Sequence, residues 1–100
     1  MRIAMIGGVE RNERVLGEIA TSLGHELEYH GGHMKGRGVD EMWMLVRRCD
    51  LLIISTDVNS HTAVAVARRV ARTEGKEVLL TRSGSPSKFR ALLRGLSKAA

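Results

Sequence analysis

Hydrophobic and polar positions form four similar units along the chain, each a short apolar run followed by a longer amphipathic stretch. Each run ends at glycine or polar residues, which is typical of a β-strand that leads into a turn. A strand that is apolar throughout is buried on both faces, whereas alternation indicates an edge strand. We therefore expect Leu51–Ser55 to be central and Glu26–His30 to lie at an edge. The four predicted strands are Arg2–Ile6, Glu26–His30, Leu51–Ser55 and Glu77–Thr81.

Apolar residues at helical spacing follow each strand and predict four helices. Asn59 or Ser60 is expected to cap the third helix, and Ser85-Pro86 to begin the fourth. The glycine-rich segment 31–38 predicts a mobile loop before the second helix, which starts at Val39. The apolar stripes are Val15, Leu16, Ile19, Ala20 and Leu23 before Gly24; Met42, Trp43, Val46 and Cys49; Ala63, Val64, Ala67, Val70 and Ala71 before Gly75; and Phe89, Leu92, Leu93 and Leu96.

Four strand-then-helix units with short connections predict a parallel sheet with right-handed crossovers. We expect a single α/β domain over residues 1–100, a small three-layer domain of Rossmann-like or flavodoxin-like type. With the most hydrophobic strands in the centre, the four-stranded sheet has the order 2-1-3-4. This order places a crevice between the loops Gly7 to Asn12 and Thr56 to His61, where ligands commonly bind in such folds.

Composition agrees with this fold class and suggests a cellular compartment. Hydrophobic residues make up 43% of the chain and aromatic residues 3%, so the core consists mainly of aliphatic side chains. The single cysteine, Cys49, has no partner for an internal disulfide and lies on a helical stripe, which predicts a buried thiol. The apolar run before Gly7 is too short for a signal peptide. A cytoplasmic location is therefore expected.

The formal net charge of +5 is unevenly distributed. Residues 51–100 hold nine of the sixteen Lys and Arg but only three of the eleven Asp and Glu. A solvated surface is the simpler interpretation, because no aromatic residues are interleaved with the arginines. A nucleic-acid or protein-interaction surface around Arg68, Arg69 and Arg72 is the alternative. An exposed Met42-Trp43-Met44 segment or an open sheet edge would favour a homodimer.

Glycines and hydroxyls gather at the predicted carboxyl ends of the strands. The turn at Gly7-Gly8 offers backbone N–H groups to an anion but lacks the dinucleotide and P-loop spacings. The loop that begins at Arg82-Ser83 leads into a capped helix that could bind phosphate. An anionic small molecule is therefore one expected ligand. The candidate binding residues are Gly7, Gly8, Arg11, Gly31, Gly32, Thr56, Asp57, Ser60, His61, Arg82 and Ser83.

Histidines suggest a second kind of ligand. His30 and His33 are three residues apart across two glycines, and His61 could supply a third nitrogen if the loops converge. Imidazole is a common ligand of transition metals and haem, and Asp57 is the expected carboxylate partner. A His-x-x-His spacing also occurs by chance, so a structural role for these histidines stays open.

The expected function is a small ligand-binding or regulatory module that binds an anionic small molecule, a histidine-ligated metal or haem. An enzyme is the alternative, with His61 as general base or phosphoryl acceptor and Asp57 as its orienting carboxylate. The lack of a second carboxylate or nucleophile at recognisable spacing counts against catalysis.

A set of short motifs in a fixed order resembles the bacterial family known as domain of unknown function 2325. The resemblance covers nearly the whole chain and implies a small α/β domain without an established activity. It draws attention to the same glycines and histidines, and its most specific segment is Asp57-x-x-Ser60-His61. The motifs are Gly7-Gly8, His30-Gly31-Gly32, Asp57-x-x-Ser60-His61, Gly75-Lys76 and the Arg82-Ser83 loop before Phe89.

Overall fold

Strands and helices alternate through the chain, as the sequence predicts. The computed structural model describes residues 1–8, 10–57, 59–82 and 85–99. Helix α3 is capped by Ser60, whose hydroxyl accepts a hydrogen bond from the Ala63 N–H at 3.0 Å. The elements are β1 (Arg2–Ile6), the 3-10 helix η1 (Glu10–Asn12), α1 (Glu13–Ser22), β2 (Glu26–His30), α2 (Gly38–Arg48), β3 (Leu51–Ser55), α3 (His61–Thr73), β4 (Glu77–Thr81) and α4 (Pro86–Ala99).

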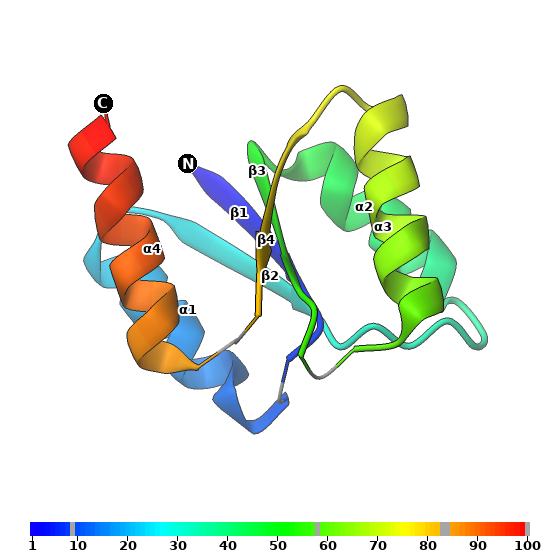
Figure 1. Ribbon diagram of the computed structural model, residues 1–100, viewed down its shortest axis with the longest axis horizontal. Coiled ribbons are helices and arrows are strands. Elements are labelled where there is room, and N and C mark those ends of the chain that lie inside the picture. Colours follow the sequence, from blue (N-terminus) through cyan, green and yellow to red (C-terminus); the bar gives the residue numbers. More distant parts are fainter. Residues whose placement is uncertain (9, 58, 83–84, 100) are drawn as a thin grey trace.

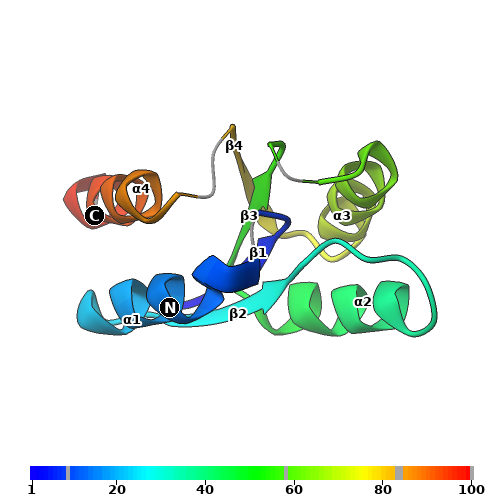
Figure 2. The same cartoon turned by 90° about the horizontal axis from the view of Figure 1, so that it is seen from below.

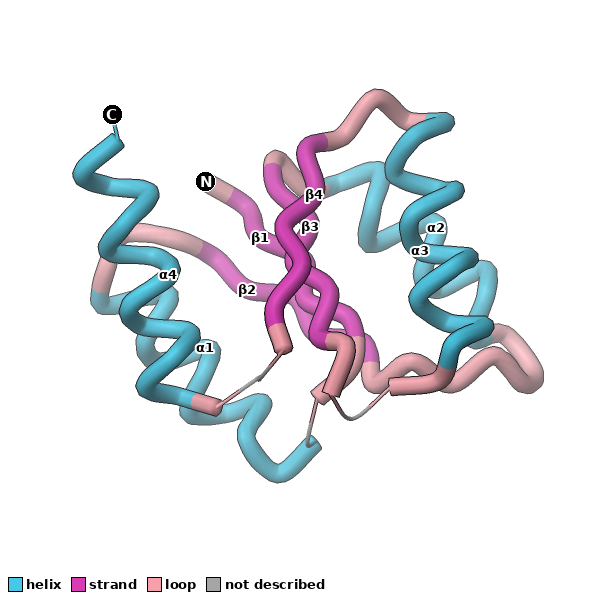
Figure 3. The backbone as a smooth tube through the Cα atoms, viewed as in Figure 1, coloured by secondary structure: helices cyan, strands magenta, loops and turns pink. Residues whose placement is uncertain are grey.

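The four strands form one parallel sheet in the order β2-β1-β3-β4 (Figures 1 and 3). This confirms the predicted order, with β3 buried along its whole length and β2 at an edge. Because all strands run in one direction, the loops that follow them meet at the same end of the sheet. Figure 3 shows these loops gathered below the strands.

Two helices cover each face of the sheet, which gives three layers (Figure 2). Helices α2 and α3 pack on Ala4, Ile6, Leu52 and Ile54, and α1 and α4 pack on the alternate residues of the same strands. Alternation follows from the two-residue period of a strand. The two cores are therefore separated only by the backbone of β1 and β3.

Two sulfur-containing residues, one in α2 and one directly after it, belong to the core that α2 and α3 form with the sheet. Met42 is fully buried, as its place on the predicted apolar stripe requires, and Trp43 is half-buried. Within the Met42-Trp43-Met44 segment, whose exposure would have favoured a homodimer, Met44 alone is exposed. Cys49 is buried, and burial raises the pKa of its thiol. A neutral buried thiol behaves as a small hydrophobic group, in agreement with the prediction. Across the described residues, no helix is both long and apolar enough to cross a membrane.

Candidate metal and ligand site at the carboxyl end of β2

The side chain of Asn59 fills the crevice predicted between the loops after β1 and β3. Its amide donates hydrogen bonds to the carbonyl oxygens of Ser55 at 2.8 Å and Ile6 at 3.4 Å. Gly7 has a φ of +88°, and a Cβ added there would lie 2.3 Å from Asn59 Nδ2. A small molecule bound at the Gly7-Gly8 turn would therefore have to displace this amide.

The same asparagine also contacts the loop after β2. Gly32 has a φ of +92°, and a Cβ there would lie 2.5 Å from Asn59 Oδ1. The glycines that the sequence singles out at Gly7 and Gly32 thus make room for one polar side chain. Asn59 joins three loops that are far apart in sequence, a role that the capping prediction did not include.

His30, the last residue of β2, is buried and hydrogen-bonded at both ring nitrogens. Nδ1 accepts a hydrogen bond from the Gly32 N–H at 3.0 Å, so the proton is assigned to Nε2, which lies 2.9 Å from the Gly38 carbonyl oxygen. The His30 side chain therefore connects the two ends of the glycine-rich loop between β2 and α2 through hydrogen bonds. Burial lowers the pKa of His30, against a smaller opposing effect of the Gly38 hydrogen bond.

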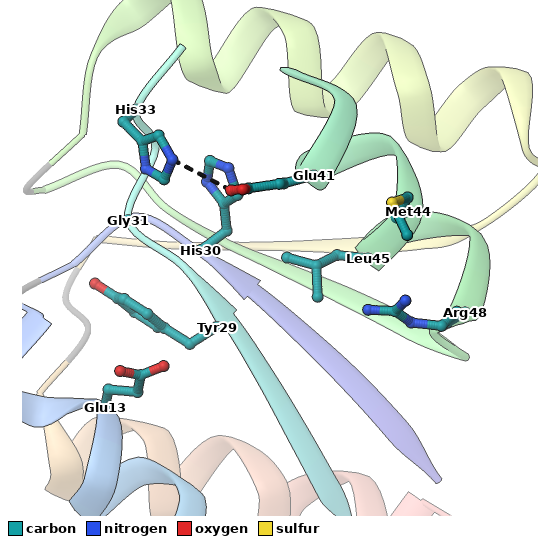
Figure 4. A pocket seen from close by; sticks show the side chains of 9 residues that line it. All are labelled: Glu13, Tyr29, His30, Gly31, His33, Glu41, Met44, Leu45 and Arg48. Atoms are coloured by element: carbon teal, nitrogen blue, oxygen red, sulfur yellow. Dashed lines mark ion pairs between the residues drawn. The ribbon is translucent and has the colours of Figure 1, made fainter. Parts of the chain in front are cut away.

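The structure brings His30 and His33 together, as the metal hypothesis requires. Their rings are stacked with centroids 4.4 Å apart and planes 8° apart. His33 Nε2 lies 3.3 Å from Glu41 Oε2, in the first turn of α2, and both side chains are more than half exposed (Figure 4). Each of the three residues offers a metal-ligating atom, and these atoms all lie within 4.8 Å of one another.

A pocket of about 420 Å³ adjoins this cluster on the outer side of β2. Figure 4 shows the two histidines and Glu41 at one end and Arg48 at the other, with Met44 and Leu45 between them. Arg48 forms an ion pair with Glu28, which raises the pKa of the guanidinium. The pocket therefore has an imidazole and carboxylate end and an apolar middle.

Glu41 is the residue that sequence reasoning missed. Asp40 and Glu41 lie in the first turn of α2, and the loop that carries His33 leads directly into this turn. This acidic first turn was a readable signal. The prediction chose Asp57 as the carboxylate instead, because it assumed that the histidine-bearing loops would converge.

His61 lies outside the cluster. It is exposed at the start of α3 and lines a separate hollow together with Thr56 and Ser60. Over the residues that the structure describes, no hydrogen bond or ion pair joins His61 to Asp57, the pair on which the enzyme alternative depends. The other predicted ligand-binding residues are spread over the molecule. Gly31 lines the pocket at the end of β2, and the carbonyl oxygen of Gly8 accepts a hydrogen bond from the Tyr29 hydroxyl. Arg11 and Arg82 are exposed, and Ser83 lies outside the described residues.

The titration of His30 gives a prediction for stability. An unfolded histidine gains its proton near pH 6.5, whereas folded His30, with its lowered pKa, gains it only at lower pH. Its contribution is therefore complete above about pH 6.5 and is lost as the pH falls from there through the folded pKa. We expect the free energy of unfolding, measured by urea titration at several pH values, to fall with pH in this window. If the free energy of unfolding of the His30→Leu variant falls equally with pH, groups other than His30 cause the effect.

Comparison with known proteins places the chain in a family. A UPF0751 protein from each of two strains of Desulfitobacterium hafniense is 29% identical over 83 residues, covering 82% of this chain and 81% of the relative. No solved structure is significantly similar. The family described as uncharacterized protein conserved in bacteria (DUF2325) matches residues 2–96. This match spans both cores, the Asn59 junction and the histidine cluster, and the chain therefore belongs to the DUF2325 family.

Proposed function

We propose that this chain is a small binding module that holds one divalent transition-metal ion through His30, His33 and Glu41. The observation that carries the proposal is the approach of three ligand atoms from these residues to within 4.8 Å of one another. Two imidazoles and one carboxylate are a ligand set that zinc and related metals accept. The three residues come from the end of β2, the following loop and the start of α2.

The environment of His30 supports this role. A metal ligand must be deprotonated, and burial lowers the pKa of His30 and so favours its neutral form. Metal-binding histidines commonly donate their other N–H to a backbone carbonyl, as His30 Nε2 does to Gly38. Nδ1 is then the ligand atom, and the metal takes the place of the Gly32 N–H.

Metal binding requires the His33 ring to turn. Lone pairs of imidazole lie in the ring plane, and two planes only 8° apart do not converge on one ion at bonding distance. His33 is free to rotate because its side chain is 56% exposed and contacts Glu41 through a single ion pair. Under this proposal, metal binding exchanges the stack of the two rings for ligation of one ion by both.

Three protein ligands leave at least one coordination position for water or a small ligand. The adjoining pocket, lined also by Met44 and Leu45, is large enough for a small molecule, and the charge of the metal favours an anionic one. A free metal ion is favoured over haem, because haem iron accepts at most two axial ligands and the cluster offers three. The module is therefore proposed to bind a metal and, through it, a small anion.

Isothermal titration calorimetry with zinc chloride tests this proposal. We expect one zinc ion per chain, and His33→Ala or Glu41→Gln to weaken binding about a hundredfold, because each ligand supplies roughly a quarter of the binding free energy of a structural zinc. Titration with Co²⁺ gives a second readout, since its visible absorption reports the ligand set. Both replaced side chains are more than half exposed, so the variants are expected to fold.

His61→Ala is the matched control, because it removes an exposed histidine outside the cluster. It should bind zinc as the unmodified chain does. Absence of zinc binding at micromolar concentrations, or equal loss in His61→Ala and His33→Ala, would refute the proposed site.

A further inference from the structure

The outer edge of β4 and the adjacent side of α3 form a second distinctive surface, which we call the β4 edge surface. It contains two adjoining hollows of about 380 and 350 Å³, which share Arg68. The first is lined by Thr56 and by residues between Asn59 and Arg68, and the second by Arg68, Arg72, Lys76, Val78 and Leu80. Together they run along the whole side of α3 next to β4.

Among the described residues, the cations on this surface have no ion-pair partner. No Asp or Glu lines either hollow, and among the described residues none of Arg68, Arg72 and Lys76 takes part in an ion pair. On α2, by contrast, Arg47 and Arg48 are paired with glutamates. The positions 61, 65, 68 and 72 fall on one helical face, so the cations form a row parallel to the strand.

The strand beside this row has an open edge. Within the described residues, β4 pairs with β3 alone, and Figure 2 shows it between α3 and α4 with no helix across its outer side. Val78 packs against the core on the α3 face, so Leu80, two residues later, lies on the same face. Leu80 is 50% exposed. The surface therefore combines an open strand edge, an apolar strip and a row of cations.

We propose that the β4 edge surface binds an extended acidic segment of a partner protein, which adds a fifth strand beside β4. Backbone hydrogen bonds to the open edge would supply affinity, and side chains on one face of the added strand would supply specificity. Those that point toward α3 are Asp or Glu opposite Arg68, Arg72 and Lys76, with an apolar side chain beside Leu80. This inference does not depend on the metal site.

Charge and composition select this occupant over two others. A second copy of β4 would bring the same uncompensated cations to the interface, and like charges repel. Single-stranded nucleic acid is bound by cations together with aromatic rings on which bases stack. Neither hollow is lined by Phe, Tyr or Trp, and a phosphate backbone would leave the apolar strip of Val78 and Leu80 unused.

Fluorescence anisotropy with a short labelled peptide of alternating Val and Glu tests the proposal on the full chain. We expect saturable binding, and amide NMR shifts in β4 on addition of the peptide. The double variant Arg68→Glu/Arg72→Glu should weaken binding about tenfold or more, because two attractive contacts become repulsive. Both side chains are exposed, so the fold should be retained.

The matched control is Arg90→Glu/Arg94→Glu, which makes the same change in net charge at two exposed positions of α4. This control should weaken peptide binding by less than about twofold, because salt screens charges that lie far from the bound peptide. Equal weakening by both double variants would show diffuse electrostatic attraction and overturn the proposal. So would tighter binding of an oligo-dT strand than of the peptide, or no peptide binding up to about 1 mM.

Discussion

Gly7→Ala is expected to lower the free energy of unfolding by about 3 kcal/mol, the sum of a left-handed backbone penalty and an overpacking penalty. Gly7 has a φ of +88°, which an alanine adopts only at a cost. The added Cβ would also lie 2.3 Å from Asn59 Nδ2, so the amide that joins the loops would have to move. Urea unfolding followed by circular dichroism measures the change.

A double-mutant cycle with Asn59→Ala separates the two penalties. Asn59→Ala alone is destabilising, because the carbonyl of Ser55 loses its 2.8 Å hydrogen bond. In that background the two atoms nearest to the new Cβ, Nδ2 and Cγ, are gone, and only the Cβ of residue 59 at 3.0 Å remains. Gly7→Ala should then cost about 1–2 kcal/mol, mostly for its backbone. Strictly additive effects would mean that Asn59 does not occupy the crevice between β1 and β3.

His30→Leu is expected to lower the free energy of unfolding by about 3 kcal/mol, since two backbone groups lose their partners. The Gly32 N–H and the Gly38 carbonyl are bonded to the two ring nitrogens, and leucine replaces neither bond. The ring is 4% exposed, so water compensates poorly. The measurement is urea unfolding in the presence of EDTA, which removes any contribution of bound metal.

His33→Ala is the appropriate comparison for His30→Leu. Its ring is exposed and contacts other groups through a stack and one ion pair, so its removal should change stability by less than about 0.5 kcal/mol. The two histidines thus have different roles: His30 stabilises the loop, and the His33 side chain is able to move. If His33→Ala were as destabilising as His30→Leu, the loop would be held differently from this description.

Most of the fold could be predicted from local pattern. The four strands begin and end at the predicted residues because each is a short run bounded by glycine or polar residues, and the strand order follows from the hydrophobicity of Leu51–Ser55. The Ser60 cap was one of two predicted alternatives. Met42 is buried, as its place on the predicted helical stripe with Val46 and Cys49 requires.

The candidate site was predicted only in part. His30 and His33 are only three residues apart, and this short separation allows their rings to meet. That pair could therefore be predicted from the sequence. The acidic first turn of α2 marked Glu41 as a candidate, but its approach to the pair depends on the path of a loop that two backbone hydrogen bonds to His30 hold in place. The sequence pattern does not reveal that path. Asn59 was missed for a similar reason, since its role depends on where the loops after β1 and β2 pass one another.

The two open edges of the sheet differ in a way that bears on polymerisation. An edge strand rich in glutamate, such as β2, would attract the basic β4 edge surface of another copy. A head-to-tail contact of this kind forms a ring if the rotation between copies closes, and a filament if it does not. In this chain Glu26 is paired with Arg2, and Glu28 with Arg48. These ion pairs neutralise the β2 edge from within the same copy and so weaken the electrostatic drive toward filaments.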